Sequence, residues 1–173
     1  MRAPDGEIRY RRARPEDAPA AMAVVQAGFE TYRSFAPQDW EPPDETRPEE
    51  LERSREQLAD PATTAYVAED AGRIVGHVRI VDARTPSPDG STPDRHFRHL
   101  FVLEPYWGTG VADRLHALAV ADLEGTARLF TPEAQARARR FYERRGWRLH
   151  HGPHLVPALP FPLVEYRLTR QSV

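Results

Sequence analysis

The sequence predicts a single α/β domain over residues 1–173, and three observations support this. A chain of this length matches one domain and can bury a sufficient core without cross-links. Apolar residues alternate with polar ones in some segments and recur at helical spacing in others, which indicates strands and helices in succession. No internal repeat and no change of composition divides the chain.

The composition excludes several classes of protein. There is no cysteine, so the chain has no disulfide framework. All 24 basic residues are arginine and the formal net charge is −2, so no global positive field favours nucleic acid. No apolar run approaches about 18 residues and no charged-then-apolar leader is present, so we expect no membrane association and a cytoplasmic protein.

The first elements are a strand and a helix. Polar and apolar residues alternate at 8–12, which predicts a short strand that Pro15 ends. Apolar residues then recur at helical spacing from Met22 to Tyr32, so one face of the predicted helix can be buried.

A loop, a second helix and a hairpin follow. The loop is rich in proline and acid, and the helix after it has only a thin apolar stripe, which predicts a lid-like surface helix. Thr46 is its expected N-cap, Pro48 a proline in its first turn and Glu49 the capping-box partner. Two strand patterns, at 63–70 and 73–83, are joined by Ala71–Gly72, which predicts a β-hairpin.

The second half of the chain continues the alternation of strands and helices. An apolar run ends the strand predicted at 96–103, which implies burial on both faces. In the last helix Ala134 is expected to face inward. The predicted elements are a flexible loop at 84–94, strands at 96–103, 126–131, 148–150 and 163–169, and helices at 111–123 and 132–147.

The stretch PYWGTGVADRL, Pro105 to Leu115, places two glycines between a predicted strand and a predicted helix. A helix N-terminus leaves about four backbone N–H groups unpaired and carries partial positive charge, so it can hold a phosphate. Gly108 and Gly110 lack the Cβ atoms that would obstruct a ligand there. The same glycines also suit a tight turn at positive φ, so by themselves they leave both interpretations open. A Walker loop and a dinucleotide fingerprint are excluded, because neither Gly-Lys-Ser/Thr nor a third glycine follows.

The segment LFVLEPYWGTGVADRL resembles the acyl-CoA-binding motif of the GNAT superfamily of N-acyltransferases, in which a strand runs into a Q/R-x-x-G-x-G/A turn and a helix. Gly110 and Ala112 match the motif, whereas Trp107 stands at its first position. The segment TPEAQARARRFYERRGW resembles a late helix of the family, with Gln135 where Asn is common and Tyr142 at the family's tyrosine. The resemblance implies a mixed, mostly antiparallel sheet of six to seven strands, flanked by about four helices and splayed between strands 4 and 5.

The same resemblance implies that acetyl-CoA binds in the gap between the splayed strands. The backbone of Leu100, Phe101 and Val102 would pair with the pantetheine arm. Gln135 and Tyr142 would also contact the cofactor. The residues that would hold the pyrophosphate are Gly108, Thr109, Gly110, Val111, Ala112 and Asp113.

The chemistry implied by this family is direct attack of an amine on the thioester carbonyl. Tyr142 is the candidate acid for the departing thiolate, because a phenol with a pKa of about 10 stays protonated above a thiol at about 8.5. Packing beside Phe141 is the alternative role. His96 is the candidate base, at the offset where a histone-acetylating branch of the superfamily has a carboxylate, with Glu133 and Glu30 as rivals. Many members use ordered water instead of a dedicated base.

Two further groups of residues have a binding and a structural interpretation. Glu30, Asp39 and Trp40 are the predicted contacts to a cationic amine, and a solvated acidic loop is the alternative. The stretch HHGPH holds three histidines, but Gly152 and Pro153 predict a turn there and no carboxylate lies at ligand spacing, so we expect no metal.

We therefore expect a cytoplasmic N-acetyltransferase that moves an acetyl group from acetyl-CoA to a primary amine of a small molecule. Acetylation of a protein N-terminus or lysine is the first alternative, but the lid-like helix and the segment LVPALPFPL predict a more enclosed pocket. A sensor that binds acyl-CoA without turnover is the alternative from another class. Dimers are frequent in this family, so the resemblance is compatible with a homodimer.

Overall fold

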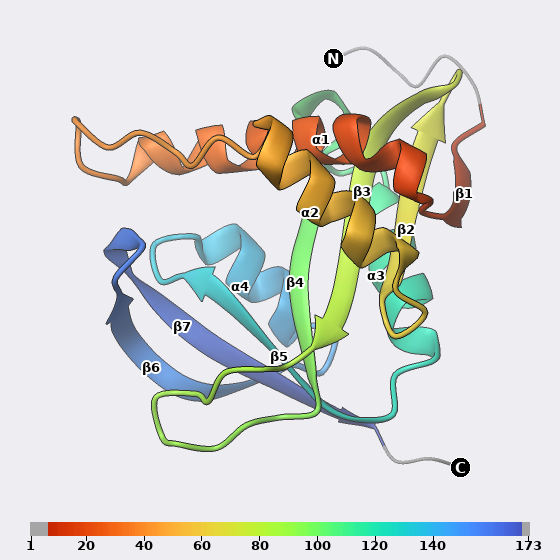
Figure 1. The fold of residues 1–173 in the computed structure, drawn as a ribbon. Coiled ribbons are helices and arrows are strands. Elements are labelled where there is room, and N and C mark those ends of the chain that lie inside the picture. The colour runs from red at the N-terminus through yellow and green to blue at the C-terminus, as the bar shows by residue number, and fades with distance from the viewer. Residues whose placement is uncertain (1–6, 171–173) are drawn as a thin grey trace.

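A seven-stranded mixed sheet forms the centre of the protein, as predicted. The computed structural model describes residues 7–170. The strand order is β1-β2-β3-β4-β5-β7-β6, and only the pair β4–β5 is parallel. Four α-helices flank the sheet in the described residues (Figure 1). The strands are β1 (Arg9–Arg12), β2 (Thr64–Asp70), β3 (Arg73–Asp82), β4 (Arg95–Val102), β5 (Gly125–Pro132), β6 (Arg148–Val156) and β7 (Leu159–Arg170). The helices are α1 (Ala18–Glu30), α2 (Pro48–Ala59), α3 (Val111–Ala121) and α4 (Ala136–Glu143), with 3-10 turns at η1 (Pro15–Asp17), η2 (Thr31–Ser34) and η3 (Glu104–Tyr106).

The helices cover both faces of the sheet. α1 and α2 lie on one face and α3 lies on the other (Figure 1). The periodicity in the sequence predicted the buried stripes correctly, since Met22 and Val25 of α1 and Leu115 and Ala119 of α3 are at most 2% exposed. Within residues 7–170, no helix combines the length and the apolarity that crossing a membrane requires.

The pair β4–β5 is splayed, as the resemblance implied. Its ladder joins only Arg95 to Ala127 and His96 to Arg128, and beyond these residues the strands diverge (Figure 1). The edge of β4 that faces β5 is therefore unpaired along residues 97–102. Such an edge can accept another extended chain as a partner.

A bulge in β4 determines which side chains face which helices. Arg79 of β3 pairs with His99, but the next residue, Ile80, pairs with Phe97, so Arg98 is the extra residue. The bulge changes the alternation of side chains along the strand. As a result Phe97 packs against α3 and α4, whereas His99 faces α1 on the other side.

Two helix starts predicted from the sequence are wrong. The N-cap of α2 is Arg47, because Pro48 occupies the first helical position, and the Thr46 hydroxyl instead donates to the Asp44 carboxylate at 2.6 Å. α4 begins at Ala136 instead of residue 132, because β5 continues to pair with β7 as far as Pro132. Ala134, which precedes this helix, is exposed instead of inward-facing.

Two strand predictions also need correction. Gly152 and Pro153 lie inside β6, where shifts in register absorb them, and the turn to β7 comes at residues 157–158. An edge strand tolerates proline because its outer side has no partner strand. The end of β4, residues 100–102, is half-buried instead of buried on both faces, because it lines a cavity.

Candidate active site

Two cavities lie on either side of Phe101 in β4. The α4 cavity, of about 760 Å³, is lined by residues of the segments 27–35, 100–107 and 134–142, together with Arg73 and Ala112. The α2 cavity, of about 580 Å³, is lined by residues of the segments 57–63, 81–85, 96–101, 128–132 and 158–163, together with Phe29 and Tyr32. Phe101 is the residue that contributes to the lining of both cavities.

The position of Phe101 depends on a glycine in α1. The ring packs edge-on against Phe29 and lies close to Tyr32, with centroids 5.4 and 6.4 Å apart. A Cβ atom at Gly28 would lie 2.0 Å from the Phe101 ring, so only glycine lets α1 approach β4 this closely. Nothing in the sequence near Gly28 indicates this contact, so Gly28 could not be predicted as part of the site.

The α4 cavity contains the predicted cofactor-binding side chains. Leu100, Phe101 and Val102 enter it from β4, and Ala112, Gln135 and Tyr142 enter it from α3 and the α4 segment. The remaining predicted residues form the turn beside this cavity and the first turn of α3: Gly108, Thr109, Gly110, Val111 and Asp113.

The glycine turn has the positive φ angles of a tight turn and also the open space that a phosphate would need. Gly108 and Gly110 have φ values of +76° and +90°, so the chain needs glycine for the turn itself. Nothing lies within 4 Å of a Cβ built at either position, so the space above the turn is also open. Gly110 caps α3 with no side-chain hydrogen bond, which leaves the first N–H groups of the helix available for an anion.

Trp107, which departs from the family motif, connects the turn to its surroundings. Its indole N–H donates to the Val102 carbonyl at 2.7 Å, and the Arg137 guanidinium lies 4.3 Å from the centre of its ring. The Val102 carbonyl, one of the groups expected to face pantetheine, therefore already accepts a hydrogen bond. Arg137 brings a positive charge from α4 close to the turn, where it adds to the attraction for phosphate.

Tyr142 lies in α4 and is buried between aromatic rings. It packs edge-on against Phe97, Phe141 and Trp147, so the packing role is present. Tyr142 also lines the α4 cavity, and its hydroxyl has no hydrogen bond to any residue in 7–170. Burial raises the pKa of the phenol above its ordinary value, so the hydroxyl stays protonated and can act as a hydrogen-bond donor.

These features fit a bound acyl-CoA. The free N–H groups of the turn and Arg137 suit a pyrophosphate, and the unpaired edge of β4 suits an extended, amide-containing arm. Tyr142 lies further along the same cavity.

His96 lines the α2 cavity but is a weak base. Its ring packs edge-on against Phe130. Burial and the charges of Arg128 and Arg98 lower the pKa of His96 to about 3. The imidazole is therefore neutral at physiological pH and accepts a proton poorly. Glu133, the rival candidate, lines neither cavity in the described residues.

The predicted acceptor residues lie outside both cavities in the described part of the chain. Glu30 pairs with Arg33 at 2.6 Å on the surface, and Asp39 is exposed. Trp40 packs against Phe161. The acidic side chains of this region are thus either paired with a nearby arginine or exposed to solvent.

The α2 cavity instead contains arginines that sequence reasoning did not single out. Arg84 comes from the loop before β4, Arg98 from the bulge and Arg128 from β5. A chain with 24 arginines has no pattern that marks these three, because their proximity depends on the sheet.

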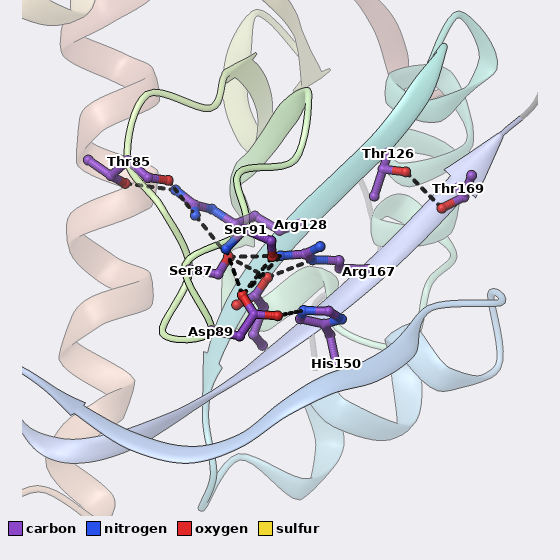
Figure 2. Close-up of polar contacts among 10 residues, drawn as sticks. Thr85, Ser87, Asp89, Ser91, Thr126, Arg128, His150, Arg167 and Thr169 are labelled. Carbon is purple, nitrogen blue, oxygen red and sulfur yellow. Dashed lines mark hydrogen bonds and ion pairs between the residues drawn. The ribbon is translucent and has the colours of Figure 1, made fainter.

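The loop at 84–94, predicted as flexible, is anchored by a polar network (Figure 2). Ser87 donates to the buried Glu165 carboxylate at 2.8 Å, and His150 bonds Asp89 at 2.7 Å. His150 thus has a carboxylate neighbour from a distant segment. His151 and His154 both contact the Gly152 carbonyl through Nδ1. In residues 7–170 no three metal-ligating side chains form a group.

Comparison with known proteins agrees with this geometry. A model of the acetyltransferase (GNAT) domain matches residues 33–159. A Corynebacterium glutamicum protein, described as histone acetyltransferase HPA2 and related acetyltransferase, has a similar fold, with TM-score 0.69, 18% identity and coverage of 97% of this chain and 99% of that chain. The PaiA N-acetyltransferase of Thermoplasma acidophilum, solved with coenzyme A, gives TM-score 0.65, 12% identity and coverage of 92% and 98%. NAA60 of Arabidopsis thaliana, solved with a bisubstrate analogue, gives TM-score 0.60, 18% identity and coverage of 94% and 97%.

At these identities the solved structures establish the fold alone. No curated protein sequence matches the chain significantly. The family model, in contrast, spans well over half of the sequence, including β4, the glycine turn and α4. The chain belongs to the GNAT family of acetyltransferases.

Proposed function

We propose that this protein is a cytoplasmic N-acetyltransferase that uses acetyl-CoA to acetylate a primary amine of a small molecule. The observation that carries the proposal is the meeting of two cavities at Phe101. One has an open glycine turn at its side and Tyr142 in its wall, and the other is a separate chamber. A donor and an acceptor can thus approach one another at Phe101.

The roles of the residues follow from this arrangement. Acetyl-CoA supplies a thioester whose carbonyl carbon forms the new bond to nitrogen and whose sulfur leaves as a thiolate. The unpaired N–H groups of β4 can stabilise negative charge on the carbonyl oxygen. The Tyr142 hydroxyl donates its proton to the sulfur and recovers one from solvent.

The acceptor amine must lose a proton before it attacks. An alkylammonium has a pKa of about 10, and His96, with a pKa of about 3, cannot remove that proton efficiently. The proposed reacting form is therefore the free amine that exists in equilibrium with its ammonium in solvent, so that bulk water takes the proton without a dedicated base. His96 then contributes a neutral wall and a hydrogen-bonding group.

A small-molecule acceptor is favoured by the size of the α2 cavity and by the segments that border it. The end of α2, the start of the 84–94 loop and the β6–β7 turn contribute to its wall, through residues such as Gln57, Thr85 and Ala158. A volume of about 580 Å³ lies within the range of sites for small ligands. A protein substrate would instead need an open groove on this face.

Thiol release from acetyl-CoA tests the proposal, with amines, aminoglycosides and short peptides as acceptors. We expect release that depends on a small amine and gives a stoichiometric N-acetyl product by mass spectrometry. Turnover of peptides alone would show a protein acetyltransferase. Binding of acetyl-CoA by calorimetry with no release from any acceptor would show a sensor and refute the enzymatic proposal.

A further inference from the structure

We propose that the acceptor amine also carries an anionic group, a carboxylate or a phosphonate, which Arg98 and Arg84 bind in the α2 cavity. The inference rests on the proposed function, because it concerns the acceptor of that reaction. It reverses the sequence-based expectation, in which a cationic acceptor met the acidic loop around Trp40.

The wall of the α2 cavity carries more positive than negative charge. Outside the lining, Glu165 offsets part of the charge of Arg128 and Glu45 part of that of Arg98. An anion in the cavity would still find counter-charges in Arg84 and Arg98. The cations in the lining are Arg84, Arg98 and Arg128, and the anions are Asp60 and Asp82.

The two carboxylates in the lining do not neutralise these arginines. Asp82 forms an ion pair with Arg95 at 2.9 Å, on the other strand of the β3–β4 pair. Asp60 accepts the backbone N–H of Ala62 at 2.8 Å and forms no ion pair with a described residue. Asp60 is therefore available to attract the ammonium end of an acceptor that has both charges.

The arginines of the lining differ in how their donors are used. The Arg128 guanidinium is buried and donates to the carbonyl and the hydroxyl of Thr85, at 2.7 and 2.8 Å (Figure 2). Arg84 and Arg98 form no hydrogen bond or ion pair with any residue in 7–170. Arg84 and Arg98 are exposed residues that line one cavity, and without such partners their guanidinium groups are available to pair with a carboxylate or phosphonate.

Arg84 is held at the rim by the anchored loop. The bonds from Ser87 to Glu165 and from Asp89 to His150 fix the loop on β7 and β6 (Figure 2). The neighbouring Thr85 is fixed by Arg128. The backbone at Arg84 is thus positioned before any ligand binds, which lowers the entropic cost of recognition.

The region behind Arg98 shows the same excess of positive charge. Burial and the charge of Arg98 lower the pKa of the buried Arg79 to about 10, with Glu45 as the opposing charge. Burial and Arg98 also lower the pKa of His99 well below its ordinary value. An anion beside Arg98 would relieve this repulsion, so the cavity has an electrostatic reason to bind one.

His99 adds a neutral hydrogen-bonding group to the same wall. It lines the α2 cavity, is 8% exposed, and its Nδ1 has no hydrogen-bond partner among residues 7–170. A buried, unsatisfied imidazole nitrogen is costly. In the tautomer with a proton on Nδ1, this nitrogen can donate to an anion.

Matched acceptors test the proposal directly. The panel consists of α- and ω-amino acids of increasing chain length, the carboxamide of each, and aminoalkylphosphonates. We expect kcat/KM from thiol release to favour the anionic amine over its matched amide by roughly 10-fold or more, as a charged hydrogen-bonding pair would give. The preference should fall as salt is raised. Comparison of the amino acids with the aminoalkylphosphonates identifies whether a carboxylate or a phosphonate is preferred.

Variants of Arg98 test whether this residue causes the preference for an anionic acceptor. Arg98→Gln should reduce kcat/KM by roughly 10-fold for the anionic amine and by much less for its amide. Arg98→Lys should restore part of the loss, because the charge remains without the fork. Arg148→Gln is the matched control, since Arg148 is exposed on β6 and lines neither of the described cavities; it should leave the preference intact.

The outcomes separate this inference from the proposed function. Turnover in which acids and amides react equally well would overturn the anion site and leave the N-acetyltransferase in place. If no amine is turned over, calorimetry with CoA-loaded protein decides. Tighter binding of acids than amides that is lost in Arg98→Gln would support the anion site, and equal binding would overturn it.

Discussion

The two cavities that meet at Phe101 are built in different ways. The α4 cavity relies on backbone, through a glycine turn, a helix N-terminus and an unpaired strand edge, and its lining side chains are mostly apolar. The α2 cavity relies on ionisable side chains from segments far apart in the chain. A site made of backbone suits a donor that is common to a family, whereas a site made of side chains can change its specificity by substitution.

The largest expected effect concerns Tyr142, the proposed acid in the α4 cavity. Tyr142→Phe removes a hydroxyl whose proton is needed at the sulfur, so kcat should fall by about 100-fold, the lower range for a general acid. The KM for acetyl-CoA should change little, because the ring and its packing remain. Steady-state thiol release measures both values.

Tyr66→Phe is the control for this variant. Tyr66 lies in β2 and lines neither described cavity, so its removal should leave kcat near the wild-type value. An unchanged kcat in Tyr142→Phe would leave Tyr142 with the packing role alone.

The next effect concerns the glycine turn. Gly110→Val places a branched side chain at φ +90° and over the free N–H groups, so acetyl-CoA should bind at least about 10-fold more weakly by calorimetry. Gly72→Val is the matched control, because Gly72 has φ +81°, an equally open Cβ position and a place in the β2–β3 turn. Both variants carry backbone strain, and only the first should lose the cofactor. Equal affinities in the two variants would contradict a phosphate site at the turn.

A smaller effect is expected from the network that anchors the α2 cavity. Ser87→Ala removes the hydroxyl that bonds the buried Glu165, which should lower the free energy of unfolding by about 1–3 kcal/mol. Because Ser87 holds the loop that carries Arg84, the KM for the acceptor should rise while acetyl-CoA affinity is maintained. Urea unfolding measures the free energy of unfolding, steady-state thiol release the KM for the acceptor, and calorimetry the acetyl-CoA affinity.

Thr169→Val is the comparison for Ser87→Ala. Its hydroxyl pairs with Thr126 at 2.9 Å in an exposed position near the other end of β7 (Figure 2). Thr169→Val should lower the free energy of unfolding by no more than about 0.5 kcal/mol. A weaker acetyl-CoA affinity in Ser87→Ala would show that the two cavities are not independent.

The smallest effect is expected at His96. With a pKa of about 3, its imidazole is neutral across pH 5–9, so it cannot produce a limb in the pH profile of kcat/KM. The rate should rise with pH as the acceptor ammonium loses its proton, with the same profile in His96→Gln. A wild-type limb near pH 6.5 that disappears in the variant would identify His96 as the base.

Local patterns in the sequence singled out residues that line the α4 cavity or form the turn beside it, and their binding of a cofactor stays a prediction. Gly108 to Asp113 are contiguous, and Gln135 and Tyr142 lie on one short segment, so a motif can record them. The same holds for the helix and strand order, which depends on periodicity. The exact starts of α2 and α4 were wrong, because strand pairing and Pro48 determine them.

The α2 cavity could not be predicted in this way. Arg98 faces it because of a bulge that exists only through pairing with β3, and Arg84 and Arg128 reach it through the sheet. The acidic loop was the conspicuous local signal, but Arg33 pairs with both Glu30 and Glu41 there. The charged residues of the proposed acceptor cavity are brought together by the fold, and composition alone does not identify them.

A crystal structure with coenzyme A bound would test the central claim most directly. We expect the pyrophosphate on the N–H groups of residues 108–113, the pantetheine arm along the free edge of β4, and the sulfur within hydrogen-bonding reach of the Tyr142 hydroxyl beside Phe101. Coenzyme A bound elsewhere, or with its sulfur directed away from Phe101, would contradict the assignment of the two cavities to donor and acceptor.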